Sequence, residues 1–389
     1  MTGLALFGEV NLSPPPKRPT ESDFQFLNRA EGEPWQNLRD LLESWYCDFP
    51  DDTYDLRNRF RTPSRPQHVG AWWELYIFSL FRRLGYEITV HPNMPGTTKN
   101  PDFLVEQDSL EAIVECAVML DEDRWTDSDG ISWVLECIDS AKDANFRLGV
   151  DIKTEGSQRP KRASIIRAVE NWLNSLDADA ANEAWQQQPG KAPTTDLGIT
   201  DWVINLVAYP IPTEKRAVGS HLIVRWPMKS GVLGHDDQLV KILSNKGSRY
   251  GQLDKPLVVA ILAWPITAGE MSLTNALFGP LTVDVHRTST DLHVAGVSRN
   301  VDGYWRPAPN PGGSRTSAVL LGEMLRPDRP FVTLPRVWVN PWATVPLQAL
   351  PPLENTMLEG DHLVVEDASA TTDEVFGYPP HWPHAPWPG

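Results

Sequence analysis

Pro101-Asp102-Phe103-Leu104-Val105 and Val114-Glu115-Cys116-Ala117 are the two stretches that decide the fold. Both lie in apolar runs that predict β-strands, and the polar turn at 107–109 predicts that the strands form a hairpin. An acid opens the first strand, and a second acid lies midway along the next. We therefore expect Asp102 and Glu115 to be neighbours across the hairpin.

The elements around this hairpin alternate between the periods of helices and strands. An apolar helix is expected from about 67 to 84, and a strand follows at 86–90. After the hairpin, the pattern predicts a helix at 128–141 and a strand at 146–152. The alternation continues to about residue 265, which is typical of an α/β protein with a mixed β-sheet flanked by helices.

Composition divides the chain into four parts. Residues 1–30 are expected to be an exposed lead-in, and residues 31–279 the α/β core. A Pro- and Trp-rich C-terminal extension, 280–364, is expected to pack on that core. The tail, 365–389, is expected to be largely disordered.

The bulk composition is that of a globular protein, with 41% hydrophobic and 22% charged residues in 389. No apolar run is long enough to span a membrane. Three cysteines at no metal-binding spacing favour a reducing cytoplasm. The net charge of −16 argues mildly against nucleic acid, although the distribution of charge matters more than its sum.

Glu115 is a charged residue in an otherwise apolar strand. Because side chains alternate along a strand, Ile113, Glu115 and Ala117 share one face. A buried carboxylate needs a metal, an arginine or hydrogen bonds as its partner. The carboxylates of Asp102 and Glu115, with the main-chain carbonyl of Cys116, can hold Mg²⁺ or Mn²⁺ through oxygens.

The order of a helix with Glu74, a strand, Pro101-Asp102, Glu115-Cys116-Ala117, a helix and a strand resembles the PD-(D/E)XK nuclease superfamily. The resemblance implies the restriction-endonuclease-like fold, a Mg²⁺ or Mn²⁺ site at Asp102 and Glu115, and hydrolysis of DNA phosphodiester bonds. Three further motifs look like those of a bacterial branch of this superfamily, which implies a setting in anti-phage defence. They are Lys246-Gly247-Ser248-Arg249-Tyr250-Gly251, Ala276-Leu277-Phe278-Gly279 and Trp338-Val339-Asn340-Pro341-Trp342-Ala343.

The chain departs from the superfamily pattern at Ala117, where the motif has a lysine. Within the superfamily that lysine sometimes comes from another element. Lys99, Lys153 and Lys246 are the candidates, and Lys153 is preferred because it follows the expected fourth core strand. The catalytic set implied by the resemblance is Glu74, Asp102, Glu115 and Lys153.

Several alternatives stay open. Glu74 can pair with Arg82 or Arg83 instead of ordering a metal-bound water, and the arginines at 57–65 can contact DNA or balance acids. The protein can be a DNA endonuclease, or a nuclease-fold protein that no longer cleaves and binds nucleic acid or a protein. A third reading is an interaction protein that uses its C-terminal extension, and homo-oligomers are compatible with each reading.

Overall fold

The computed structural model describes residues 4–15, 17–18, 21–108, 110–120, 129–188, 191–216, 222–225, 235–251, 253–264, 270–287, 292–300, 302–349, 351–360 and 362–384. The chain forms an α/β protein with two compact units. Unit 1 comprises Met1–Pro16, Ser22–Asp121 and Leu233–Gly389, and unit 2 comprises Lys17–Glu21 and Glu122–Val232. Each unit has a sheet and a hydrophobic core of its own.

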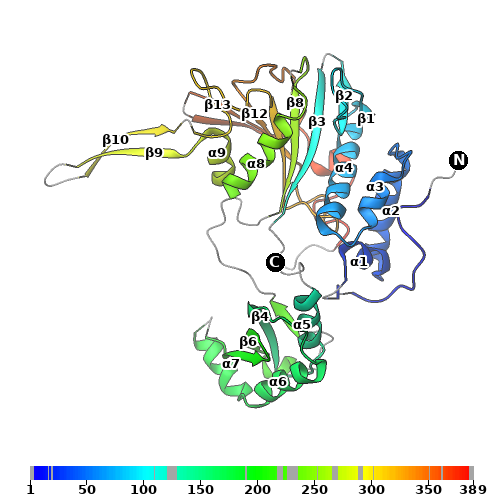
Figure 1. Ribbon diagram of the computed structural model, residues 1–389, viewed down its shortest axis with the longest axis vertical. Coiled ribbons are helices and arrows are strands. Elements are labelled where there is room, and N and C mark those ends of the chain that lie inside the picture. The colour runs from blue at the N-terminus through cyan, green and yellow to red at the C-terminus, as the bar shows by residue number, and fades with distance from the viewer. Residues whose placement is uncertain are drawn as a thin grey trace. The chain divides into compact units, whose positions relative to one another are not determined.

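Unit 1 is built on an eight-stranded mixed sheet of order β1-β2-β3-β8-β11-β12-β13-β14. The first three strands form an antiparallel meander, whereas β8 runs parallel to both β3 and β11. The strands are β1 (Glu87–Val90), β2 (Phe103–Gln107), β3 (Leu110–Met119), β8 (Leu257–Ala263), β11 (Ala318–Glu323), β12 (Arg336–Val339), β13 (Asn355–Glu359) and β14 (His362–Glu366). A separate hairpin of β9 (Leu281–Arg287) and β10 (Leu292–Arg299) projects from the unit (Figure 1).

Helices cover both faces of this sheet, as Figure 1 shows. Helix α4 (Arg65–Arg83) packs on one face, and α8 (His235–Gly247) and α9 (Glu270–Phe278) lie on the other. Alternation along β3 divides its side chains between the two cores: Val114 and Cys116 face α4, and Ile113 faces α8. The remaining helices of unit 1 are α1 (Asp23–Arg29), α2 (Glu33–Asp48), α3 (Asp55–Arg61) and α10 (Thr372–Phe376).

Helix α4 packs on the face of the sheet opposite α8. Its sequence explains where the helix begins and ends. Pro66 fits the first turn, where a missing N–H costs nothing, and Gly85 follows the helix with a φ of 88°. The Trp73 ring is fully buried, and its Nε1 donates to the main-chain oxygen of Ala260 in β8 at 2.9 Å. This bond ties the helix to the central strand of the sheet.

Unit 2 carries a four-stranded sheet of order β5-β6-β4-β7 and its own hydrophobic core. The central pair, β4 and β6, is antiparallel, and β7 runs parallel to β4. Its elements are α5 (Asp129–Asp139), β4 (Phe146–Thr154), α6 (Arg162–Asn174), α7 (Ala178–Gln187), β5 (Thr194–Ile199), β6 (Trp202–Pro210), the 3₁₀ turn Thr213–Lys215 and β7 (Ile223–Arg225).

The two units change the organisation that the sequence predicted. The expected helix at 128–141 and strand at 146–152 exist as α5 and β4, but they belong to unit 2. In the unit 1 sheet, the strand beside β3 is β8, and α8 precedes it in the chain. The expected core, 31–279, therefore spans parts of both units, with unit 2 inserted between β3 and α8.

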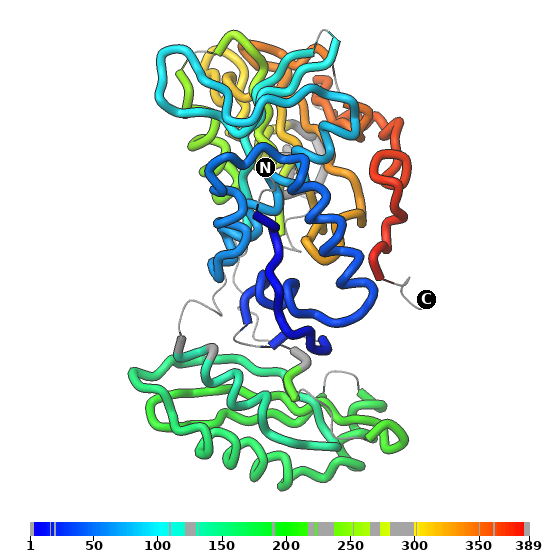
Figure 2. The backbone as a smooth tube through the Cα atoms, turned by 90° about the vertical axis from the view of Figure 1, so that its right-hand side faces the viewer, coloured from blue at the N-terminus to red at the C-terminus, as the bar shows by residue number. Residues whose placement is uncertain are grey.

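The C-terminal region is also more integrated than predicted. Strands β11 to β14 complete the main sheet instead of packing on it as an extension. The tail expected to be disordered contains α10, whose Phe376 is buried against Trp45 of α2. Figure 2 shows this C-terminal segment beside the N-terminal helices. The lead-in is anchored too, because Leu6 and Phe24 are buried in the same core.

Candidate functional site

The hairpin brings Asp102 and Glu115 together as the sequence predicted. Phe103 of β2 pairs with Val114 of β3, so Asp102 stands beside Glu115 at the start of β2. The Oδ2 atom of Asp102 accepts the main-chain N–H of Cys116 at 2.7 Å. The side chain of Glu115 is fully buried and faces α8, the side opposite α4.

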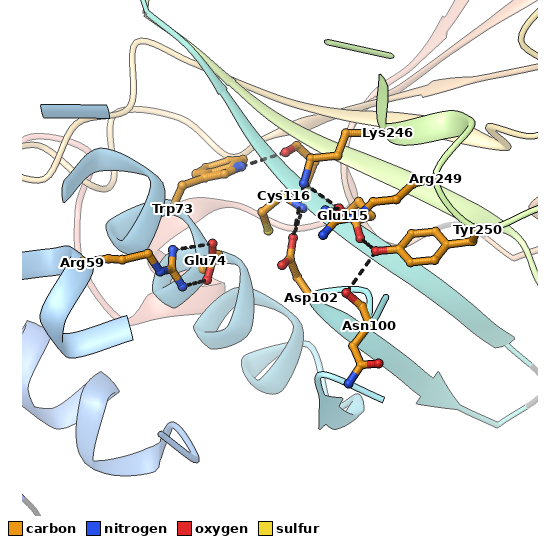
Figure 3. A network of polar contacts seen from close by, with 11 residues as sticks. Arg59, Trp73, Glu74, Asn100, Asp102, Glu115, Cys116, Lys246, Arg249 and Tyr250 are labelled. Carbon is orange, nitrogen blue, oxygen red and sulfur yellow. Dashed lines mark hydrogen bonds and ion pairs between the residues drawn. The ribbon is translucent and has the colours of Figure 1, made fainter. Parts of the chain in front are cut away.

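Three donors from the end of α8 converge on Glu115 (Figure 3). The Nζ atom of Lys246 lies 2.5 Å from Oε2 of Glu115 and 3.9 Å from Oδ2 of Asp102. Arg249 reaches the same Glu115 oxygen at 3.4 Å, and the Tyr250 hydroxyl contacts the other. That hydroxyl also lies 3.1 Å from the carbonyl of Asn100, and its single hydrogen serves one acceptor at a time.

Gly247 explains how α8 comes close enough to place Lys246 over the strand. A Cβ atom on Gly247 would lie 2.7 Å from Oγ1 of Thr316 and would also collide with the Tyr304 hydroxyl. The Tyr304 hydroxyl in turn donates to the carbonyl of Leu243, which fixes the same turn of the helix. The Lys-Gly sequence at the helix end thus combines a charged side chain with a close approach.

Burial and neighbouring charges shift the pKa values of Glu115 and Lys246. Burial, and then the negative charge of Asp102, raises the pKa of Glu115 to about 7, against the opposing effect of Lys246. Burial alone would lower the pKa of Lys246, but the charges of Asp102 and Glu115 outweigh it and raise that pKa above its ordinary value. Nearby negative charge raises both pKa values, whereas burial raises that of Glu115 and opposes the rise at Lys246.

Glu74 lies on the α4 side and has its own partner. Its two oxygens accept from Arg59 of α3 at 2.8 and 2.6 Å, so Arg59 takes the place of the expected Arg82 or Arg83. Burial raises the pKa of Glu74, Arg59 lowers it, and the charge of Asp102 raises it further. Glu74 is thus within the electrostatic reach of the acid pair, and its role in ordering a water stays a prediction.

Among the three candidate lysines, the structure brings Lys246 to the acids. Lys153, the preferred candidate, lies on β4 of unit 2 and pairs with Asp196 at 2.8 Å. It does not follow a strand of the sheet that carries Glu115, so the argument for choosing it was wrong. Lys99 lies in the exposed loop before Asp102. The sequence did mark Lys246 and Tyr250 in one motif, but it gave no sign that this motif faces Glu115.

The arginines between 57 and 65 hold the N-terminal segment in place. Arg57 donates to the carbonyl of Ala5 at 2.7 Å, and Arg61 donates to the carbonyl of Leu6 at 3.2 Å. Arg65 lies 3.4 Å from a carboxylate oxygen of Asp23. With Arg59 bound to Glu74, each of these four arginines has an internal partner, and contact of this segment with DNA stays a prediction.

The donor set fits a hard divalent cation with few protein ligands. The described part of the chain contains no cluster of three or more His, Cys, Asp or Glu side chains suited to a metal. Asp102 and Glu115 therefore offer two carboxylates, which is the number that Mg²⁺ commonly uses when waters or phosphates complete its shell. Burial, and then the charge of Asp102, raises the pKa of Glu115, and a cation held by the two acids would oppose both effects.

Comparisons of the chain with protein-family models, with curated proteins and with solved structures found no match. The likeness to a nuclease therefore depends on the order of the elements and on the residues of the site. Among the described helices, none combines the length and the apolar character needed to cross a bilayer.

Proposed function

We propose that this protein is a metal-dependent endonuclease of the PD-(D/E)XK type that hydrolyses DNA phosphodiester bonds, in the setting of bacterial defence against phage. The order of elements supports the proposal. Helix α4, the meander β1-β2-β3, helix α8 and the parallel strand β8 reproduce the helix, three strands, helix and strand of the superfamily resemblance. Unit 2 is then an insertion into that order.

The observation that carries the proposal is the position of Lys246. Ala117 leaves the superfamily's lysine position empty, but Lys246 reaches Glu115 at 2.5 Å and Asp102 at 3.9 Å from the neighbouring helix. A lysine, an aspartate and a glutamate therefore meet at one place, although they come from α8, β2 and β3. This is the set of side chains that the resemblance requires.

Each residue has a distinct role in this proposal. Asp102 and Glu115 would hold Mg²⁺ or Mn²⁺, which when bound activates water and stabilises negative charge on a phosphodiester. Lys246 takes the role of the missing lysine and places its ammonium against the attacking water or the phosphate. Tyr250 orients Glu115 through its hydroxyl, and Asp102 is oriented by the N–H of Cys116.

A second candidate function has one specific observation in its favour. Both oxygens of Glu115 already have partners, with Lys246 and Arg249 on one and Tyr250 on the other. Two cations beside two acids balance the local charge without a metal. This arrangement fits a nuclease-fold protein that binds nucleic acid or a protein partner and no longer cleaves.

The test is a cleavage assay on single-stranded and duplex DNA with Mg²⁺ and with Mn²⁺. Asp102→Asn keeps an oxygen for the Cys116 N–H and removes the charge, so we expect it to abolish metal-dependent cleavage. Asp196→Asn, at an exposed acid of unit 2, is the matched control and should cleave like the wild type. Absence of cleavage by the wild type under all conditions would favour the second candidate, and equal cleavage by all three proteins would place the activity elsewhere.

A further inference from the structure

A second feature of unit 1 lies beyond the acid pair. A surface pocket of about 230 Å³ opens between the loop before β8 and the loop before β11. It is lined by Leu253, Lys255, Ser314, Arg315, Thr344 and Val345. The polar groups of this lining are two cations and two hydroxyls, with no acid among them. Such groups are donors that recognise the oxygens of a phosphate.

The two cations differ in whether an acid already pairs with them. Lys255 is held by Glu111 of β3 at 2.6 Å, so half of the pocket's positive charge is balanced. Arg315 is exposed, and no ion-pair partner for it is found among the described residues. Arg315 therefore supplies most of the net attraction for an anion, and Lys255 is a positioned second donor. This is notable in a chain with a net charge of −16.

The pocket is connected to the candidate site through two short links. The chain passes from Tyr250, which contacts Glu115, to Leu253 and Lys255 within the same loop. From the other side, Thr316, next to Arg315, lies 3.1 Å from the Tyr304 hydroxyl, which also binds α8.

Along β3, the four-residue step from Glu111 to Glu115 spans about 13 Å. At about 3.4 Å of rise per nucleotide, this is a few nucleotides of a DNA strand. The pocket and the acid pair are thus close enough for one strand to contact both.

We propose that this pocket, through Arg315, Lys255 and the hydroxyls of Ser314 and Thr344, binds a backbone phosphate of a DNA strand whose phosphodiester a few nucleotides away lies at Asp102 and Glu115. This inference rests on the proposed function, and it adds a second contact point for the DNA strand on the surface of unit 1. In this role the pocket contacts the sugar-phosphate backbone, which carries no sequence information directly. It therefore contributes affinity and register but no sequence preference.

The experiment measures binding separately from cleavage. Fluorescence anisotropy of a labelled oligonucleotide, single-stranded and duplex, is recorded with the full chain in EDTA at several salt concentrations. Arg315→Gln should weaken binding about fivefold and lower the slope of log affinity against log salt by about one. Lys255→Gln should have a smaller effect because Glu111 already balances its charge. Arg326→Gln, an equal change of charge at a residue paired with Asp328, is the control and should match the wild type.

Equal affinity and slope for wild type and Arg315→Gln, or no binding by the wild type, would overturn the assignment of the pocket. Inorganic phosphate is titrated separately, and displacement of the oligonucleotide at comparable affinity would assign the pocket to free phosphate instead. If Arg315→Gln weakens binding but the wild type never cleaves with Mg²⁺ or Mn²⁺, the pocket stands and the nuclease proposal falls. If the wild type cleaves but Arg315→Gln binds DNA as the wild type does, the nuclease proposal stands and the assignment of the pocket falls.

Discussion

Two lysine–carboxylate pairs of this protein have similar lengths and very different surroundings. Lys153 and Asp196 of unit 2 lie 2.8 Å apart, with 46% and 48% of their side chains exposed. Lys246 and Glu115 of unit 1 lie 2.5 Å apart, with 22% and 0% exposed. The distance alone would make them equivalent.

The difference in exposure decides what each pair does. Water and salt screen the pair of Lys153 and Asp196, so it contributes little to stability. The pair of Lys246 and Glu115 is held beside Asp102 away from water, where charges interact strongly and the pKa of Glu115 rises to about 7. Perturbed groups of this kind gather at functional sites, which is why the second pair, and not the first, supports a catalytic reading.

The largest expected contrast is in stability. Lys246→Met leaves Asp102 and Glu115 as two close acids with only Arg249 to balance them, and it should lower the free energy of unfolding by about 3 kcal/mol at pH 8. Urea denaturation measures this value, and Lys153→Met should remain within error of the wild type. At pH 6 the loss should shrink, because Glu115 then takes up a proton. Equal effects of the two substitutions would remove the distinction between the pairs.

The next contrast is in cleavage, measured at a temperature where circular dichroism shows both variants to be folded. Lys246→Met should reduce the rate at saturating DNA by about 100-fold, as expected for the loss of a positioned catalytic group. Lys153→Met should cleave at the wild-type rate. A loss of activity in Lys153→Met alone would restore the lysine that the sequence first suggested.

The smallest contrast is in pH dependence. Because the pKa of Glu115 is raised to about 7, its carboxylate form is lost as the pH falls through that value. A cation must displace this proton to bind, so cleavage at subsaturating Mg²⁺ should fall about tenfold per pH unit below 7 and level off above it. Asp196 has a lowered pKa through its hydrogen bonds with Lys153 and Asn205, so this carboxylate adds no transition in this range. A rate independent of pH between 6 and 8 would contradict the role of Glu115.

Local sequence patterns predicted the parts of the fold that depend on neighbouring residues. The helix expected at 67–84 is α4, Asp102 immediately precedes β2, and Glu115 lies on β3. The period of two correctly predicted that Ala117 shares the face of Glu115, since it packs on the α8 side.

The partner of β3 depends on residues far along the chain, and the patterns did not reveal it. The strands β4 and β8 are both rich in apolar residues, but only β8 pairs with β3. Periodicity gives the type of an element and leaves its neighbour in the sheet undefined. For the same reason the sequence offered Lys246 as a candidate and could not choose it, because its approach to Glu115 requires α8 to pack on a strand that lies before residues 122–232 of unit 2.

The central claim is that Asp102 and Glu115 form a site for a divalent cation. Isothermal titration calorimetry with Mn²⁺ at pH 8, in the absence of DNA, tests it without depending on catalysis. We expect binding by the wild type and by Asp196→Asn, and loss of that binding in Asp102→Asn. A urea denaturation midpoint close to that of the wild type checks that Asp102→Asn is folded. Equal Mn²⁺ binding by all three proteins, or no binding by the wild type, would contradict the central claim.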